Sequence, residues 1–142
     1  MKKLEETKPV VLGGDLNVAH KEIDIYDTKG KEKVPGFSPQ ERKSFDDFLS
    51  GSGFIDTFRY LHPEEVKYTF WSVRANLRPA NKGWRLDYFL ASSKAMPYVQ
   101  ESLIHNEYYG SDHCPISLQL NFSKKAAAKD EKDVEEKVEK KE

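Results

Sequence analysis

The chain has 142 residues, of which 37% are hydrophobic and 33% are charged, and its formal net charge is −1. This length suits one small domain rather than two, and the balanced charge excludes a protein that binds nucleic acid through bulk positive charge. Its single cysteine, Cys114, excludes an internal disulfide, and no apolar stretch approaches membrane-spanning length. We therefore expect a soluble intracellular protein that does not associate with a membrane.

Two parts of the chain differ in composition. The eight phenylalanines, seven tyrosines and two tryptophans all lie within residues 1–123. Residues 124–142 are mostly lysine, glutamate and aspartate, and such a segment cannot bury enough apolar surface to offset the entropy of ordering it. The sequence therefore predicts one folded unit at residues 1–123 and a low-complexity charged C-terminal tail at 124–142, either disordered or loosely helical.

The first predicted strand lies at residues 9–12, an apolar run that is typical of a strand covered on both faces. Two glycines end it, and Asp15 and Asn17 follow within the stretch VVLGGDLNVA. Residues two apart in an extended segment point the same way, so these two side chains are expected to face one ligand. A polar loop is predicted from there to Lys33.

A helix is predicted most strongly in the stretch FSPQERKSFDDFLSGSG. Ser38 is a good N-cap, Pro39 suits the first helical position, and Glu41 stands where it closes a capping box. Gly51 or Gly53 is expected to end the helix. One face of it carries an apolar stripe that would pack on the core, formed by Phe45, Phe48 and Leu49.

The remaining elements are mostly strands. A short turn or helix is predicted at residues 54–61, followed by strands at 68–73 and 85–92, which are rich in aromatic and branched side chains. A brief helix is expected from Ser93 until Pro97 interrupts it. The last strand begins at Ile116, where apolar and polar residues alternate up to Phe122, so one face should lie on a core. We therefore predict an α/β fold.

Polar residues that can do chemistry follow or precede three of the predicted strands. Asp15 and Asn17 end the first, Asp87 opens the third, and Asp112 and His113 come just before the last. Carboxylates, an amide and an imidazole at one edge of a sheet suit a hard divalent cation together with a group that handles a proton. Mg²⁺ is the natural candidate, because it binds one or two carboxylates and keeps water or phosphate oxygens as its other ligands.

Each of these groups also has an ordinary structural explanation. The segment from Asp15 to Asn17 is equally typical of an Asx turn, and Asp87 can be a satisfied structural carboxylate. Asp112 and His113 can cap a turn, and Cys114 without a base of its own is better interpreted as buried filler than as a nucleophile. No role is assigned to the other histidines, whose surroundings suggest the surface: His20, His62 and His105.

Several motifs carry a resemblance to a known family: GGDLNVAHKEIDI, GFSPQERKSF, YTFWSVRAN, NKGWRLDYFLAS and GSDHCPI. In order and spacing they resemble the exonuclease III type of apurinic/apyrimidinic (AP) endonucleases, within the endonuclease/exonuclease/phosphatase superfamily. The resemblance runs from Pro9 to Phe122. The Gly-Asp-x-Asn and Ser-Asp-His elements are shared across the superfamily, whereas the NKGWRLDYFLAS motif is similar to the abasic-site branch, and most to its eukaryotic members.

The resemblance implies a fold, an activity and partners. The fold would be half of a four-layered α/β sandwich of the DNase I-like kind. The activity would be that of a DNA repair endonuclease in base excision repair, which hydrolyses the phosphodiester bond 5′ to abasic sites in double-stranded DNA and depends on Mg²⁺, with Mn²⁺ as a substitute. Such enzymes act as monomers when complete, in the nucleus or, in prokaryotes, in the cytoplasm.

The resemblance also implies roles for single residues. Asp15 matches the aspartate that activates the attacking water, and Asn17 its neighbour that orients this nucleophile and contacts the metal region. Asp87 matches the aspartate that orients the catalytic histidine, His113, which contacts the phosphate. Asp112 matches a metal-site carboxylate, so the implied metal set is Asp15, Asn17, Asp112 and His113.

DNA contacts are implied for a second group of residues. Phe70 and Trp84 resemble the aromatic walls of the pocket that accepts a flipped sugar without its base, which excludes a whole nucleotide. Arg74 is expected to bind DNA. Together with it, other basic side chains would supply the local phosphate contacts that the net charge does not reveal: Lys21, Arg78, Lys82 and Arg85.

The chain departs from the family in length. Family enzymes are about twice as long as residues 1–123, and their first half supplies a metal-binding glutamate and part of the shared core. We therefore expect this chain to need that N-terminal half as a partner and to be inactive alone. The alternative is a non-catalytic module that binds damaged DNA or a protein. A phosphatase of small substrates is a third possibility, against which Trp84 in its Asn-Lys-Gly-Trp-Arg context argues.

Overall fold

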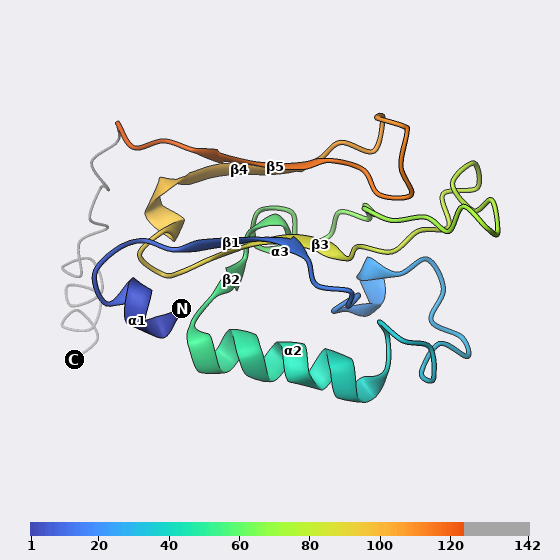
Figure 1. Ribbon diagram of the computed structural model, residues 1–142, viewed down its shortest axis with the longest axis horizontal. Coiled ribbons are helices and arrows are strands. Elements are labelled where there is room, and N and C mark those ends of the chain that lie inside the picture. Colours follow the sequence, from blue (N-terminus) through green and yellow to red (C-terminus); the bar gives the residue numbers. More distant parts are fainter. Residues whose placement is uncertain (124–142) are drawn as a thin grey trace, which may run out of the picture.

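A three-stranded antiparallel sheet forms the middle of the molecule in the computed structural model, which describes residues 1–123 (Figure 1). Its strands are β1 (Val11–Asp15), β3 (Asp87–Ala91) and the short β2 (Ile55–Asp56), in the order β1-β3-β2. The register sets Asp15 opposite Asp87. The predicted charged tail lies outside the described residues.

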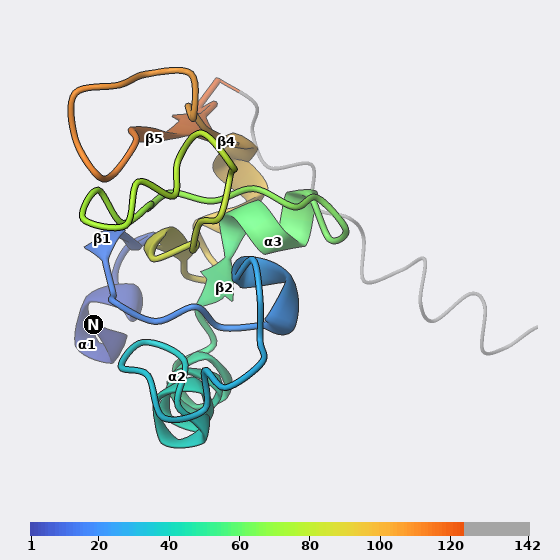
Figure 2. The same cartoon turned by 90° about the vertical axis from the view of Figure 1, so that its right-hand side faces the viewer.

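Two further layers lie on either side of this sheet. A hairpin of β4 (Val99–Ile104) and β5 (Ile116–Leu120) lies above it, and α2 (Pro39–Ser52) lies below it, as both views show (Figures 1 and 2). The shorter helices are α1 (Lys2–Glu5) and α3 (Thr57–Leu61), with 3₁₀ turns at Glu22–Asp24 and Met96–Tyr98. No helix within residues 1–123 is long and apolar enough to cross a membrane.

Helix α2 begins and ends where the sequence predicts. The Ser38 hydroxyl accepts a hydrogen bond from the Glu41 N–H, and the Glu41 carboxylate accepts one from the Ser38 N–H at 3.1 Å. This capping box satisfies two backbone donors that the first helical turn leaves free. Gly53 ends the helix in the left-handed conformation, at φ 74°. Glycine adopts this conformation easily because it has no Cβ.

The apolar core is divided between the layers. Phe45 of α2 packs with Phe54, Tyr88 and Leu90 under the sheet. A second cluster joins α3 to the hairpin and is formed by Phe58, Tyr68, Trp71, Ile104 and Cys114. The first cluster therefore joins α2 to β3, and the second joins α3 to β4.

Strand β1 differs from its prediction. Residues 9–12 were expected to be covered on both faces, but the strand runs from Val11 to Asp15 and four of its five residues are exposed. β1 is an edge strand: the Leu16 N–H donates to Leu86 and the Val10 carbonyl accepts from Ser92. Because bonding alternates along an antiparallel strand, the backbone groups of residues 11, 13 and 15 point to the free edge.

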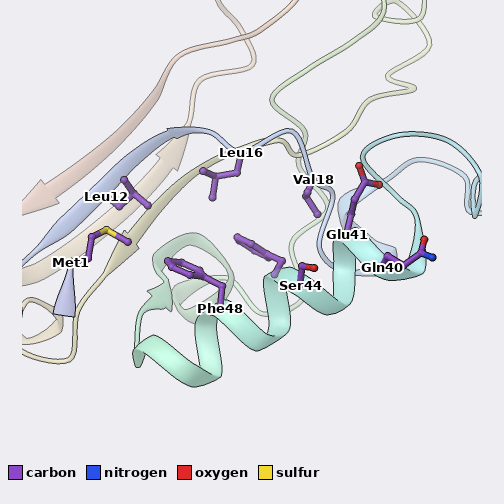
Figure 3. A pocket seen from close by; sticks show the side chains of 9 residues that line it. Met1, Leu12, Leu16, Val18, Gln40, Glu41, Ser44 and Phe48 are labelled. Atoms are coloured by element: carbon purple, nitrogen blue, oxygen red, sulfur yellow. The ribbon is translucent and has the colours of Figure 1, made fainter.

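An apolar groove of about 520 Å³ lies beside this edge, between β1 and α2 (Figure 3). Leu12 and Leu16 point into it from the strand side, and Phe48 closes it from α2. The free strand edge and this groove together form one open flank of the molecule, which we call the β1 flank.

Other secondary-structure predictions also differ from the structure. Residues 68–73 form no strand but only isolated bridges, in which Phe70 pairs with Trp84 and with His113. β4 was not predicted, and Pro97 lies inside a 3₁₀ turn rather than ending a helix. The last strand stops at Leu120, and Phe122 beyond it is 69% exposed, so its apolar face is covered only in part.

Candidate active site

Two carboxylates face each other where β1 ends and β3 begins. Asp15 and Asp87 are directly opposed in the register of the antiparallel pair. Like charges at such positions repel, which destabilises the sheet unless a cation or a proton lies between them. The fold therefore places negative charge at one edge of the sheet without supplying a lysine or arginine to either carboxylate among its described ion pairs.

His113 is the third residue of this cluster. Its Nδ1 lies 2.7 Å from Oδ2 of Asp87, and its Nε2 lies 3.9 Å from Oδ2 of Asp15. One possible ligand atom of each of the three residues lies within 4.8 Å of those of the other two. Because Nδ1 is hydrogen-bonded to Asp87, the imidazole is fixed in orientation and presents Nε2 toward Asp15.

The turn after β1 satisfies both interpretations that the sequence left open. Asn17 adopts the left-handed conformation at φ 54°, and its N–H donates to Oδ1 of Asp15 at 2.8 Å, which is an Asx turn. The sequence predicted an extended backbone at Asn17, and this prediction is wrong. Oδ2 of the same carboxylate still faces His113, so the turn holds Asp15 in place for the cluster.

An aromatic cavity of about 760 Å³ opens beside the cluster. Phe70 and Trp84 line it together with Asn17 and His113, and the Phe70 ring centroid lies 5.1 Å from that of His113. Gly36 forms part of the wall, and a Cβ there would lie 3.2 Å from the Trp84 ring at a φ of +92°. The cavity thus joins an apolar wall to the polar cluster.

Thr69 connects the parts of this site, a role that no pattern in the sequence predicts. Its hydroxyl accepts hydrogen bonds from the N–H groups of Leu86 at 2.9 Å and Asp87 at 3.1 Å. Its carbonyl accepts from the N–H of Cys114, the residue after His113. Thr69 is fully buried and therefore fixes the start of β3 against the segment that carries His113. The one signal in the sequence is a hydroxyl side chain within a run of aromatic residues.

Two predicted site residues are not brought into the cluster. Asp112 is exposed, and its carboxylate accepts a hydrogen bond from the Ser111 hydroxyl at 3.2 Å, outside the group of ligand atoms found in residues 1–123. Arg74 lies exposed in the loop after Trp71 and does not line the cavity formed by the described residues. The roles of both residues remain predictions.

The prediction that Arg85 contacts phosphate is wrong, because this side chain is fully buried. Its guanidinium binds Asp24 at 2.8 Å and Asp56 at 2.6 Å, and Arg59 adds a further bond to Asp24 at 2.6 Å. Arg78 is also engaged, with backbone carbonyls, and Lys21 pairs with Asp46. Lys82 stays exposed.

The prediction of a surface position for His20 is also wrong. His20 is 5% exposed, and burial lowers its pKa below the ordinary value although the hydrogen bond to Asp46 acts in the other direction. Cys114 is buried as predicted, and burial raises the pKa of its thiol to about 11. A thiol that ionises so reluctantly is a poor nucleophile, which fits a structural role.

Comparison with known proteins gives one consistent answer. The family model described as "Endonuclease/Exonuclease/phosphatase family" matches residues 1–113. The chain is 52% identical over 118 residues to "DNA repair nuclease APEX1" of Danio rerio, which covers 82% of this chain and 38% of that protein. It is 46% identical over 121 residues to "Exodeoxyribonuclease" of Bacillus subtilis, with 84% and 48% covered.

Solved structures agree with these sequence matches. An AP endonuclease from Leishmania major superposes with a TM-score of 0.75 at 41% identity, over 78% of this chain and 34% of that one. An AP endonuclease from Archaeoglobus fulgidus gives 0.73 at 27% identity, over 83% and 49%. The predicted partial DNase I-like α/β fold is confirmed, and the chain spans less than half the length of these relatives.

Proposed function

Because the chain belongs to the endonuclease/exonuclease/phosphatase family, we propose that it forms the C-terminal part of a DNA repair endonuclease. The reaction is hydrolysis of the phosphodiester bond 5′ to an abasic site in double-stranded DNA, and the cell compartment is the nucleus or, in a prokaryote, the cytoplasm. The observation that carries this proposal is the cluster of Asp15, Asp87 and His113 beside an aromatic cavity.

A divalent cation fits the donor set of this cluster. The opposed carboxylates of Asp15 and Asp87 are hard oxygen ligands whose mutual repulsion a cation would relieve. Mg²⁺ is the proposed ion and Mn²⁺ its substitute, with Asn17 and Asp112 as further candidate ligands. When bound, such an ion would neutralise charge that develops on the phosphate oxygens.

The side chains divide the remaining chemistry between them. Asp87 holds Nδ1 of His113 at 2.7 Å, so that a protonated Nε2 is free to donate to a phosphate oxygen as its charge grows. Asp15, whose Oδ1 is engaged with the Asn17 N–H, keeps Oδ2 free to accept a proton from the attacking water. A base and a charge-stabilising group thus lie on one side of the scissile bond.

The aromatic cavity supports the choice of an abasic substrate. Phe70 and Trp84 offer apolar surface beside His113, which suits a sugar that carries no base. Extruding a nucleotide costs least where pairing and stacking are already lost, so the substrate itself favours entry. Arg74, exposed in the loop near the cavity, is the proposed contact to the phosphate backbone.

The β1 flank supports the proposal that the remaining part of the family domain packs against this chain. Within residues 1–123 its backbone groups at residues 11, 13 and 15 pair with no other strand, and the groove at Leu12, Leu16 and Phe48 is apolar. Because the site would be completed only by that part, we expect the chain alone to cleave abasic DNA poorly or not at all.

A chimera tests this function directly. Residues 1–123 of this chain replace the matching region of the Danio rerio relative, to which they are 52% identical over 118 residues. The purified chimera is incubated with an abasic duplex and Mg²⁺, and we expect incision 5′ to the lesion. Asp15→Asn and His113→Asn should each lower the rate by about 10² to 10⁴-fold, the usual cost of removing an acid–base or charge-stabilising group.

Two results would contradict different parts of the proposal. Efficient incision by the chain alone would overturn the expectation that the site needs a further part of the family domain. A folded chimera that binds the abasic duplex, but cuts it at no metal concentration, would instead favour the non-catalytic binding module. Asp47→Asn, which changes an exposed acid on α2, serves as the matched control and should leave incision unchanged.

A further inference from the structure

Arg78 connects the loop that follows Trp71 to the segment that precedes His113. Its guanidinium lies over the Trp71 ring at 4.5 Å and over the Tyr109 ring at 4.1 Å from the centroids. Its terminal nitrogens donate to the carbonyls of Ser111 and Asn106, each at 3.1 Å, and to that of Tyr108. One side chain therefore binds three carbonyls of a single segment and two aromatic rings.

The segment that Arg78 binds leads directly into the site. Residues 106–111 contain no helix or strand, and they end two residues before His113. The Ser111 hydroxyl accepts a hydrogen bond from the His113 N–H at 3.2 Å, and the Asp112 carbonyl accepts one from the N–H of Trp71 at 2.9 Å. Where Arg78 holds the Ser111 carbonyl, it therefore also restricts the backbone that carries the imidazole.

A planar guanidinium is suited to this task in a way that an ammonium group is not. Its donors diverge in one plane and reach several carbonyls at once, while its faces remain free to stack on aromatic rings. Both features are used here, because Trp71 and Tyr109 cover the guanidinium while three carbonyls accept from its edge. Positive charge alone would not reproduce this arrangement.

We propose that Arg78 is a positioning residue that fixes segment 106–111 and thereby holds the His113 imidazole against Asp87. The role rests on the proposed function, in which His113 contacts the phosphate, but it concerns only the geometry of this chain. Arg78 was expected to contact phosphate directly, and its engagement with carbonyls and rings argues for this indirect role instead.

The test observes His113 in the full chain rather than activity. Imidazole ¹⁵N resonances are recorded at neutral pH for the wild type, Arg78→Ala and Arg78→Lys. We expect the His113 signals of both variants to shift away from the state with hydrogen-bonded Nδ1, while those of His20, paired with Asp46, stay in place. The Trp71 amide should exchange about tenfold faster, the equivalent of one weakened hydrogen bond.

The outcomes separate positioning from a general effect on stability. If both variants unfold at lower urea concentration while the His113 signals of the folded protein stay unchanged, Arg78 is merely structural and the proposal fails. Should Arg78→Ala not fold, Arg78→Lys alone decides by the same criterion. Lys43→Ala, which removes an exposed cation from α2, is the control and should leave the His113 signals unchanged. These signals are measured without DNA, so a failure of the proposed incision would not affect the result for Arg78.

Discussion

Two clusters of charged residues lie close together along β3 and occupy opposite environments. Asp24 and Arg85 are fully buried, and every carboxylate oxygen of Asp24 and Asp56 accepts a hydrogen bond from a guanidinium. Two residues further on, Asp87 begins the other cluster, where the side chains of Asp15 and His113 are 35% and 30% exposed. Aspartates therefore form a closed structural network with arginines at one place and an open site with a histidine at the next.

The difference follows from how completely each carboxylate is partnered. Burial opposes the charge on Asp24, but the guanidinium of Arg85 and the hydrogen bonds from Arg85 and Arg59 outweigh it and hold the pKa of Asp24 below its ordinary value. Asp15 and Asp87 face each other and share one imidazole. A buried network in which every carboxylate oxygen of Asp24 and Asp56 is already bonded has no capacity for a cation, whereas the partly exposed cluster can accept one.

The largest expected effect comes from breaking the buried network. Asp24→Asn should lower the free energy of unfolding by about 3–5 kcal/mol, because Arg59 and Arg85 would keep their buried charge without a full counter-charge. Urea unfolding measures this loss. Asp47→Asn on the surface of α2 is the control and should change stability by less than about 0.5 kcal/mol. Equal losses in the two variants would remove the distinction between buried and exposed pairs.

A smaller effect is expected at Thr69, which connects the two clusters through the backbone of Leu86 and Asp87. Thr69→Val keeps the shape of the side chain but leaves two N–H groups without their acceptor, at a cost of about 1–3 kcal/mol. Hydrogen exchange should speed up at these two amides in particular. Thr28→Val, in a segment that is neither helix nor strand, is the matched control, and uniform exchange rates in both variants would contradict the assigned role.

His20 provides an intermediate case, with a buried imidazole and a partner, Asp46, that is 54% exposed. Since burial lowers the pKa of His20 in the folded state, its contribution to stability is complete above the unfolded pKa of about 6.5 and is lost as the pH falls through the folded value. The free energy of unfolding should therefore decrease from neutral to mildly acidic pH. His20→Gln should flatten this dependence, and an unchanged slope would refute the assignment.

The smallest effect is expected from Asp15→Asn and has the opposite sign. Removing one of two opposed carboxylates relieves their repulsion, so the free energy of unfolding should rise by about 0.2–1 kcal/mol in the absence of metal. The asparagine oxygen can still accept from the Asn17 N–H, which keeps the turn. Urea unfolding of this variant and of Asp24→Asn compares an exposed carboxylate with a buried one. A loss of stability in Asp15→Asn would contradict the interpretation of Asp15 as part of an open site.

Much of the fold was predictable because it depends on local signals. Ser38, Glu41 and Gly53 bound α2 through bonds within one or two turns of chain, and these are visible in sequence. β1 was predicted two residues early and as a covered strand, because the short apolar run cannot reveal that β3 is its only neighbour in the described sheet. Residues 68–73 have strand composition, yet their pairing depends on Trp84 and His113 far along the chain.

The site was predictable where residues lie at strand ends and not where burial decides. Asp15, Asp87 and His113 come together as their positions suggested. Arg85 was wrongly assigned to phosphate, because no local pattern indicates that Asp24 and Asp56 bind its guanidinium. His20 was wrongly assigned to the surface, because no local pattern indicates that Phe45 of α2 packs against it. Thr69 acts through bonds to residues 17 and 18 positions away, which leave no periodic trace.

The most direct test of the central claim is a Mg²⁺ titration of the ¹⁵N-labelled chain followed by NMR. If the open cluster is a cation site, shifts should concentrate at Asp15, Asp87 and His113, spare Asp24 and Asp56, and disappear in Asp15→Asn but not in Asp47→Asn. Shifts centred on other exposed acids, or the same response in Asp15→Asn, would contradict the assignment of this cluster as the metal site.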